Sequence, residues 1–212
     1  MKQDIINTKN IIIAGVGGQG VIFAGRLLGN IAMSSGFQVK TSEIHGMSQQ
    51  GGSVITHIRY GYQVFSPVIE NGQADLMIAL EELEALRYSC YMKKDGIILL
   101  NNYKIKPVSI KQSNEEYPQD ITERLSERCC VYQLKMPDLL EKSVQGKINN
   151  IMLLGMAVNY LGFSKEKGLK AIDEIVTKEI AVLDKKAFIQ GYEMTGWESK
   201  LALRNGDSVK NP

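Results

Sequence analysis

Apolar residues run without interruption through Ile11–Ala14, and a glycine-rich segment, Gly15–Gly20, follows them directly. An unbroken β-branched run of this kind is typical of a strand that is buried on both faces. Beyond the glycines, apolar residues return at helical spacing from Val21 onward. The pattern therefore predicts a strand, a tight turn and a helix as the first elements of the chain.

The first helix is expected to extend from about Gly18 to Ser35, because Gly36 suits the left-handed conformation that ends many helices. The segment Phe37–Thr41 is then predicted as the second strand. Crossover connections between strands are almost always right-handed, so this strand–helix–strand unit should place its two strands parallel.

The regular pattern stops at Ser42–Ser53, which is polar, rich in glycine and without periodicity. We expect a long loop here, just beyond the carboxyl end of the second strand. Open α/β sheets place their ligands at this end of the strands. The length of the segment also favours a functional loop over a simple connection.

The remainder of the chain continues with strand-like and helix-like segments. Residues Val54–Tyr60 alternate between apolar and polar types and predict a half-exposed strand, with Gln63–Ser66 as a candidate hairpin partner. The other expected strands are Asp75–Leu80, Gly96–Asn101 and Val131–Leu134, and the expected helices are Glu81–Lys93, Ile121–Glu127, Asn149–Leu161, Ser164 to about Ile180, and Lys185–Met194.

Together these elements indicate an α/β protein with an open, mainly parallel, Rossmann-like sheet. Helices should cover both faces, and the helices of the last quarter should form a C-terminal cluster. We expect one domain over residues 1–204 and a flexible tail over residues 205–212.

Charge and composition exclude several classes of protein. The net charge of +2 over 212 residues is too small to indicate a nucleic-acid or membrane-surface partner. No apolar run reaches the ~18 residues of a spanning helix, and the N-terminus lacks the apolar region of a signal peptide, so we expect a cytoplasmic protein. The three cysteines form no C-x-x-C motif, which leaves too few ligands for an iron–sulfur cluster or a structural zinc ion.

The glycine segment is the first candidate for chemistry, because Gly15, Gly17 and Gly20 match G-x-G-x-x-G between a strand and a helix. Such a turn lets a ligand approach the backbone, and the free N–H groups at the helix start attract an anion. The same residues would also suit a tight turn that only packs or contacts a partner. Spacing alone leaves both interpretations open.

Other polar candidates lie near the expected loop. His45 could act as a general base, or it could be a hydrogen-bonded loop or interface residue. Glu43 lies near the position where a dinucleotide site holds a ribose. His57 should lie at the surface or face a partner. Without a further convincing ligand beside these three, we predict no metal site, and no nucleophile–base arrangement indicates a catalytic residue.

Several motifs in a fixed order resemble one known family. They are GVGGQGVIFAGRLL, KTSEIHGMSQQGGSVITHIRYG, SPVI, ADLMIALEELEALRY and the late AFIQGY. Together they resemble the gamma domain of 2-oxoacid:ferredoxin oxidoreductases. The length and the EIHGMSQ and LEALRY segments are most similar to the beta subunit of indolepyruvate:ferredoxin oxidoreductase. The glycine motif is shared by many folds, whereas HGMSQ-x-GGSV is specific.

The resemblance implies an accessory subunit of a complex that oxidatively decarboxylates a 2-oxo acid, forms an acyl-CoA and reduces ferredoxin. Thiamine diphosphate and iron–sulfur clusters would lie on a larger partner subunit, with coenzyme A as co-substrate. No nucleic acid or membrane is expected as a partner. The alternatives are a free-standing nucleotide-binding oxidoreductase and a regulatory nucleotide-binding module. The expected cofactor-binding residues are Gly15, Gly17, Gly18, Gln19, Gly20, Glu43, His45, Ser48, Gln50, Gly51 and Gly52.

One residue departs from the resemblance. The family usually carries Arg where this chain has Gln50. A guanidinium can hold a phosphate or carboxylate with two parallel hydrogen bonds, which an amide cannot do. If this position contacts substrate or coenzyme A, specificity or affinity should differ in this protein.

Overall fold

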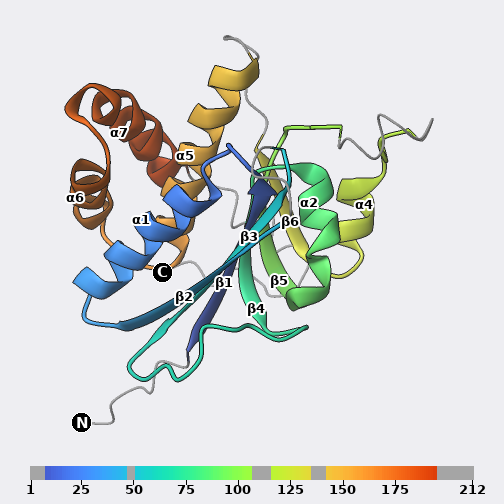
Figure 1. The fold of residues 1–212 in the computed structure, drawn as a ribbon, viewed down its shortest axis with the longest axis horizontal. Helices are drawn as coiled ribbons and strands as arrows, with labels where there is room; N and C mark the ends of the chain where they lie inside the picture. The colour runs from blue at the N-terminus through green and yellow to red at the C-terminus, as the bar shows by residue number, and fades with distance from the viewer. Residues whose placement is uncertain (1–7, 47–50, 107–115, 135–141, 195–212) are drawn as a thin grey trace, which may run out of the picture.

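The computed structural model describes residues 8–46, 51–106, 116–134 and 142–194. Within them, six strands form one sheet in the order β2-β3-β1-β4-β5-β6 (Figure 1). The apolar run of β1 therefore lies in the interior of the sheet, as its pattern predicts. The strands are β1 (Lys9–Val16), β2 (Gln38–His45), β3 (Ser53–Gly61), β4 (Ala74–Ala79), β5 (Met92–Asn101) and β6 (Cys130–Leu134).

The sheet is mixed but mainly parallel. β1, β4, β5 and β6 pair in parallel, whereas β3 pairs antiparallel with both β1 and β2. Consequently β1 and β2 point the same way, as expected, but β3 lies between them. In a standard strand–helix–strand unit, the two strands are neighbours or are separated by a further parallel strand. Here the strand between them is antiparallel to both.

The half-exposed character expected for residues 54–60 is wrong. Seven of the nine residues of β3 are buried, because β3 has a hydrogen-bonded neighbour on each side and helices near both faces. β2 is the exposed strand instead, since it forms the edge of the sheet. The alternation of residue types along β3 therefore distinguishes the two faces of the strand, but neither face is exposed to solvent.

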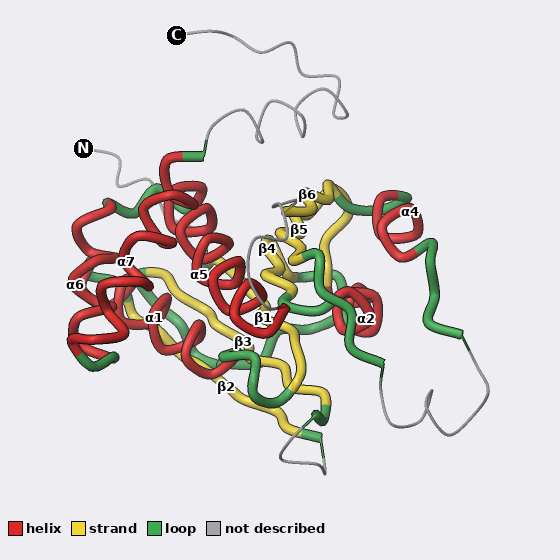
Figure 2. Tube along the Cα trace, turned by 90° about the horizontal axis from the view of Figure 1, so that it is seen from above, coloured by secondary structure: helices red, strands yellow, loops and turns green. Residues whose placement is uncertain are grey.

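Helices cover the two faces of the sheet as separate layers (Figure 2). The larger apolar core joins one face to α1, α5, α6 and α7, and the second core joins the other face to α2 and α4. This arrangement confirms the open α/β fold with a C-terminal helical cluster. The helices are α1 (Val21–Ser34), α2 (Glu82–Arg87), the 3₁₀ helix η1 (Ser89–Tyr91), α4 (Ile121–Ser126), α5 (Lys142–Tyr160), α6 (Lys165–Ile175) and α7 (Lys178–Glu193).

Several expected boundaries differ from the structure. The helix predicted to reach Lys93 ends at Arg87, because Met92 already belongs to β5 and pairs with Ala74 of β4. The helix predicted to reach Ile180 ends at Ile175, and α7 begins at Lys178. Residues 63–66 form no strand. The expected tail, residues 205–212, lies outside the described residues.

Two further findings bear on the expectations from composition. All three cysteines are free thiols, with Cys129 and Cys130 buried and Cys90 exposed. Across the described stretches of the chain, no helix combines the length and apolarity needed to span a bilayer.

Glycines allow α5 and α7 to approach closely. A Cβ atom on Gly191 would overlap the carbonyl of Met152, and one on Gly155 would overlap the carbonyl of Phe188. Phe188 in turn is fully buried in the larger core. The two helices therefore depend on backbone-to-backbone contact at these points, which no side chain can replace.

We expect Gly191→Ala to lower the free energy of unfolding by about 3 kcal/mol, because an added methyl in a closely packed contact forces the helices apart. Urea denaturation of the full chain measures the loss. The matched control is Gly29→Ala in α1, where the new Cβ would lie 3.8 Å from Val39 and helix propensity improves by up to about 1 kcal/mol. Equal stability of the two variants would contradict the packing argument.

Candidate functional site

The glycine turn adopts a conformation that requires glycine. Gly18 and Gly20 have φ angles of 95° and 89°, in the left-handed region that other residues adopt only with strain. Gly20 is also the N-cap of α1, and its carbonyl accepts the N–H of Ala24. The amides of the first turn, which precede that bond, are the unpaired donors of the helix start. The local geometry is thus suited to an anion or a carbonyl.

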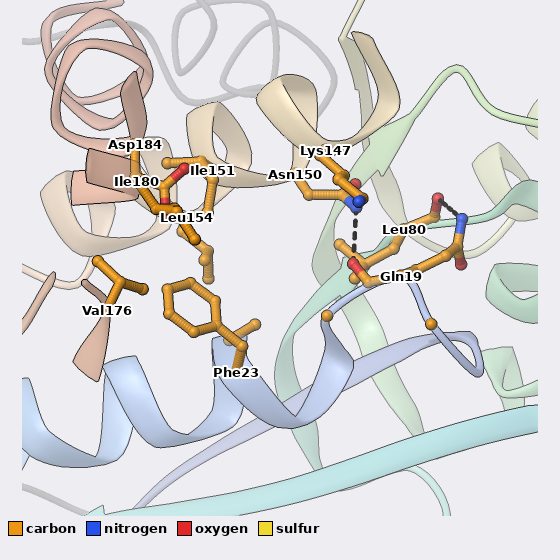
Figure 3. Close-up of a pocket in the computed structure, with 13 residues that line it drawn as sticks. Gln19, Phe23, Leu80, Lys147, Asn150, Ile151, Leu154, Val176, Ile180 and Asp184 are labelled. Carbon is orange, nitrogen blue, oxygen red and sulfur yellow. Dashed lines mark hydrogen bonds between the residues drawn. The ribbon is translucent and has the colours of Figure 1, made fainter. Parts of the chain in front are cut away.

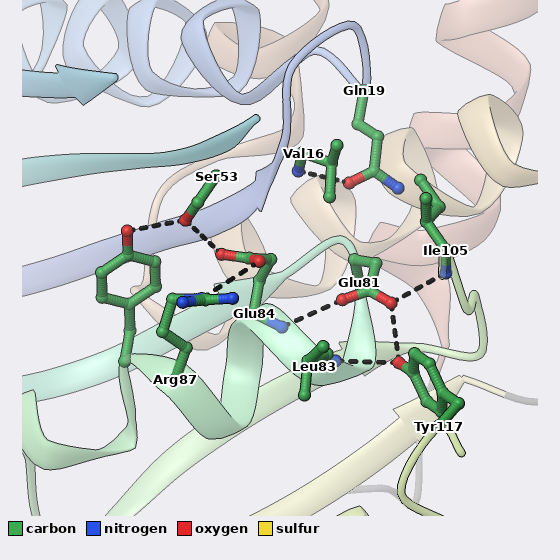
Figure 4. A network of polar contacts seen from close by, with 10 residues as sticks. Val16, Gln19, Ser53, Glu81, Leu83, Glu84, Arg87, Ile105 and Tyr117 are labelled. Carbon is green, nitrogen blue, oxygen red and sulfur yellow. Dashed lines mark hydrogen bonds and ion pairs between the residues drawn. The ribbon is translucent and has the colours of Figure 1, made fainter. Parts of the chain in front are cut away.

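Two residues of the motif face inward. The side chain of Gln19 accepts the N–H of Val16 at 2.7 Å (Figure 4) and donates to the carbonyl of Leu80 at 3.1 Å (Figure 3). A Cβ atom on Gly15 would approach Val21 to 2.8 Å, so this glycine permits close packing of helix and strand. Gln19 and Gly15 therefore fix the shape of the turn and its packing against β4 and α1.

Buried asparagines connect the glycine turn to α5 and to the end of β5. Asn150 of α5 donates to the carbonyl of Gln19 at 3.0 Å (Figure 3) and accepts from Asn101, the last residue of β5, at 2.7 Å. Asn150 is 6% exposed and Asn101 is fully buried. Amides in this environment must be hydrogen-bonded to offset desolvation. The network consequently fixes the turn against β4, β5 and α5.

The end of the predicted loop contacts the glycine turn. The N–H of Gly17 donates to the carbonyl of Gly52 at 2.8 Å. The next residue, Ser53, donates to the carboxylate of Glu84 (Figure 4). The Ser53 hydroxyl also lies 2.7 Å from the hydroxyl of Tyr88. The glycine turn and the end of the segment 42–53 therefore contact each other. Glu84 of α2 holds the residue next to this contact by a hydrogen bond.

Glu84 is a buried carboxylate, and among the described residues its ion-pair partner is Arg87. Arg87 lies 3.3 Å from it and is half exposed. Burial raises the pKa of Glu84, while the hydrogen bond from Ser53 and the charge of Arg87 act in the opposite direction. Burial likewise raises the pKa of Glu82, against the charge of Lys104. This end of α2 thus carries ionisable groups that the fold holds away from water.

Glu81 completes the polar network of α2 (Figure 4). Its carboxylate caps the helix by accepting the N–H of Glu84, and it also accepts from Ile105 and from the hydroxyl of Tyr117 at 2.7 Å. The Tyr117 hydroxyl in turn accepts the N–H of Leu83. Because each of these bonds joins neighbouring segments, the arrangement stabilises α2 and the chain around it.

An open hollow lies beside the glycine turn, between α1 and the ends of β2 and β3. Its volume is about 320 Å³. His45 contributes an exposed imidazole, and the Glu43 carboxylate lies 3.6 Å from its Nε2 atom. The hollow is lined by Val16, Gly17, Gly18, Gly20, Val21, Ile22, His45 and Val54.

Glu43 and His45 are strand residues, contrary to the expected loop beginning at Ser42. β2 continues to His45, which pairs with Val54 of β3. An exposed edge strand needs no apolar periodicity, because backbone hydrogen bonds to a single neighbour hold it. Being two residues apart on a strand, both side chains lie on the same face as α1. The structure thereby gives His45 a defined direction toward the hollow.

The strand order argues against a dinucleotide site. In that fold the second strand lies next to the first, so that its terminal acidic residue reaches the ribose. Here β3 separates β2 from β1, and neighbouring strands lie about 4.8 Å apart. Glu43 is therefore displaced by an additional strand from the glycine turn.

The surface position expected for His57 is wrong. Its side chain is 2% exposed, accepts the N–H of Ile69 on Nδ1 at 3.2 Å, and packs edge-on to Tyr91. Nε2 has no partner among the described residues. Burial lowers the pKa of His57, which favours the neutral ring. This histidine belongs to the core and takes no part in the hollow.

Of the expected site residues, Gly17, Gly18, Gly20 and His45 meet in one hollow. Glu43 and Gly52 adjoin it, Gly51 is exposed with a φ of 75°, and Ser48 and Gln50 lie outside the described residues. Asn101, Asn150 and the Ser53–Glu84 contact were missed. The adjacent Asn149-Asn150 pair in an otherwise apolar helix was the available signal, because buried amides need partners. Within the described part of the chain, no three His, Cys, Asp or Glu residues group as metal ligands.

These features define an α/β domain of Rossmann-like class in which a glycine turn opens onto a hollow outside the sheet. Comparison with known proteins identifies the family. The family model for pyruvate ferredoxin/flavodoxin oxidoreductase matches residues 10–194. The chain belongs to this family.

Individual relatives agree with that assignment. The chain is 38% identical over 189 residues to the indolepyruvate oxidoreductase subunit IorB of Archaeoglobus fulgidus, covering 86% of this chain and 93% of the relative. The gamma subunit of the keto/oxoacid ferredoxin oxidoreductase of Geobacter sulfurreducens has a similar fold, with a TM-score of 0.62, 24% identity and coverage of 87% and 96%.

A third match is a larger chain. The 2-oxoglutarate:ferredoxin oxidoreductase of Magnetococcus marinus, solved with 2-oxoglutarate, coenzyme A and succinyl-CoA, aligns with a TM-score of 0.64 and 16% identity. The alignment covers 87% of this chain and 30% of that one. At this identity the likeness shows the fold, which recurs as one part of a longer polypeptide.

We expect Asn150→Ala to lower the free energy of unfolding by about 2 kcal/mol, because it removes the side-chain donor to the Gln19 carbonyl and the shorter of two hydrogen bonds donated by the Asn101 amide nitrogen, which keeps only its bond to the Gly146 carbonyl. Urea denaturation tests the change. Lys147→Ala, on the same helix and exposed, is the control and should have little effect. A wild-type midpoint for Asn150→Ala would refute the anchoring role.

The raised pKa of Glu84 also predicts a pH dependence. The unfolded chain releases this proton near the ordinary pKa of 4.5, whereas the folded chain retains it to higher pH. Stability contributed by the neutral form is therefore lost as pH rises from that value through the folded-state pKa. Glu84→Gln should gain stability relative to the wild type between about pH 4 and pH 7, as measured by urea denaturation. The exposed Glu127→Gln should follow the wild type, and a constant offset for Glu84→Gln would exclude the effect.

Proposed function

We propose that this chain is the accessory, gamma-type subunit of a 2-oxoacid:ferredoxin oxidoreductase. The 38% identity to an indolepyruvate oxidoreductase subunit over most of both chains is the observation that carries the proposal. Thiamine diphosphate and iron–sulfur clusters would lie on a larger partner subunit, which would pass electrons to ferredoxin. This chain would complete the complex in the cytoplasm without catalytic residues of its own.

The proposed substrate is indolepyruvate or another aryl pyruvate. The name of the Archaeoglobus relative supports this choice, and residues that distinguish substrates would reside mainly on the partner. Gln50, in place of the usual Arg, is a further position at which affinity could differ from relatives.

The hollow beside the glycine turn is our proposed contact for the phosphates of coenzyme A. Gly18 and Gly20 leave the backbone accessible, since no atom lies within 4 Å of a Cβ built on either residue. Donors of the first turn of α1 face an anion favourably, and the dipole of this 14-residue helix adds to the attraction. His45 supplies a ring donor on the opposite wall. Ser48, Gln50 and Gly51 would complete the site from the adjoining segment.

Assembly is tested by co-expressing this chain with the product of the neighbouring coding sequence. We expect a stable complex with a larger, cysteine-rich, thiamine-binding subunit, and ferredoxin reduction that requires both chains and favours aryl over small 2-oxo acids. Each chain assayed separately is the control. Full turnover by either chain without the other would disprove the accessory role.

The coenzyme A contact is tested with His45→Ala in the assembled complex. Removing one hydrogen-bond donor should raise the KM for coenzyme A about fivefold with little change in kcat. Lys170→Ala, on the exposed face of α6, is the control. An unchanged KM for coenzyme A would remove His45 from the site, whereas loss of complex formation would assign it to the subunit interface.

A further inference from the structure

A second cavity lies on the other side of the glycine turn, between α1, α5 and α7 (Figure 3). Its volume is about 200 Å³. The middle of the cavity is apolar: Phe23 of α1 faces Ile151 and Leu154 of α5, and Val176 and Ile180 close the side toward α7. These apolar residues do not line the hollow beside His45, and the function proposed above assigns no role to them.

Opposite charges stand at the two ends of this cavity (Figure 3). Lys147 lies at the end next to Gln19 and Asn150, and Asp184 lies at the far end beside Ile180. Within the described residues, neither Lys147 nor Asp184 has an ion-pair or hydrogen-bond partner. Burial raises the pKa of Asp184, and no neighbouring cation counteracts it there. Both charged groups are thus available to a ligand.

The dimensions limit what could occupy the space. An apolar protein cavity of roughly 150 Å³ holds one benzene-sized molecule. The present cavity therefore accommodates one ring system with a short side chain within its walls, whereas most of a nucleotide or of coenzyme A would lie outside them. Apolar walls with a few polar groups at the ends are the usual form of a small-molecule site.

We propose that this cavity binds a compact aromatic acid that carries a hydrogen-bond donor on its ring. The carboxylate pairs with Lys147, the ring packs between Phe23 and Leu154, and the ring O–H or N–H donates to Asp184. Phenolic and indolic acids share this chemistry. The proposal concerns the isolated chain and does not depend on the proposed function.

The probe is 4-hydroxyphenylacetate, tested on the full chain by saturation-transfer NMR and calorimetry. A ligand of this size should bind with a dissociation constant of about 1 mM or below. Phenylacetate lacks the ring donor and 4-hydroxyphenylethanol lacks the carboxylate, so each should bind roughly tenfold more weakly. No detectable binding of 4-hydroxyphenylacetate would overturn the proposal.

Two variants at the ends of the cavity assign each polar contact. Asp184→Ala should remove the advantage of 4-hydroxyphenylacetate over phenylacetate while leaving phenylacetate binding unchanged. Lys147→Met should weaken both acids about tenfold and leave 4-hydroxyphenylethanol unchanged. If all three probes lose the same factor in each variant, or none changes, the assignment is wrong.

Val176→Trp should fill the cavity and abolish binding of every probe, and a urea denaturation curve will verify that it folds. His45→Ala is the matched control on the opposite side of the turn and should bind all three probes as the wild type does. Binding that survives Val176→Trp in a folded chain would place the probe elsewhere. His45 lines only the other hollow. Loss of probe binding in Val176→Trp and a raised KM for coenzyme A in His45→Ala are therefore separate outcomes, and each tests one of the two proposals.

Discussion

The amide of Gln19 and its partners hold the functional end of this protein together. Its side chain closes the glycine turn onto Val16 and ties it to the end of β4 at Leu80. Its backbone carbonyl accepts from Asn150, which continues the chain of bonds to Asn101 at the end of β5. The left-handed glycines give the turn its shape, and these hydrogen bonds fix its position relative to the sheet and to α5. The turn contributes Gly18 and Gly20 to the walls of both cavities.

Insertion of β3 between β1 and β2 sets this fold apart from a dinucleotide-binding fold. This order places a further strand between Glu43 and β1, and β2 continues to His45, which lines the open hollow beside the turn. The same insertion buries His57, which in an edge strand would be exposed. With this strand order, the glycine turn borders an open hollow that is walled on one side by the end of β2.

The buried carboxylates of α2 support the junction between the turn and its neighbouring segment. Glu81 caps the helix and holds Tyr117 and Ile105, while Glu84 holds Ser53. Buried carboxylates are costly unless every oxygen is satisfied, so such networks specify one arrangement of the segments that they join. The position of Gly52 against Gly17 follows from this support.

Elements with local signals can be predicted from the sequence alone. The apolar run of β1, the left-handed glycines after it and the apolar face of α1 require no distant partner, and the ordered motifs around them sufficed to place the chain in its family. Four features become visible only in the folded chain: the strand order, the burial of His57, the direction of His45, and the pairing of Gln19 with Asn150. Each of these features depends on contacts between segments far apart in the chain. Such contacts produce no periodic pattern in the sequence of either segment. The same holds for Lys147 and Asp184, which share a cavity only because α5 and α7 pack at glycine contacts.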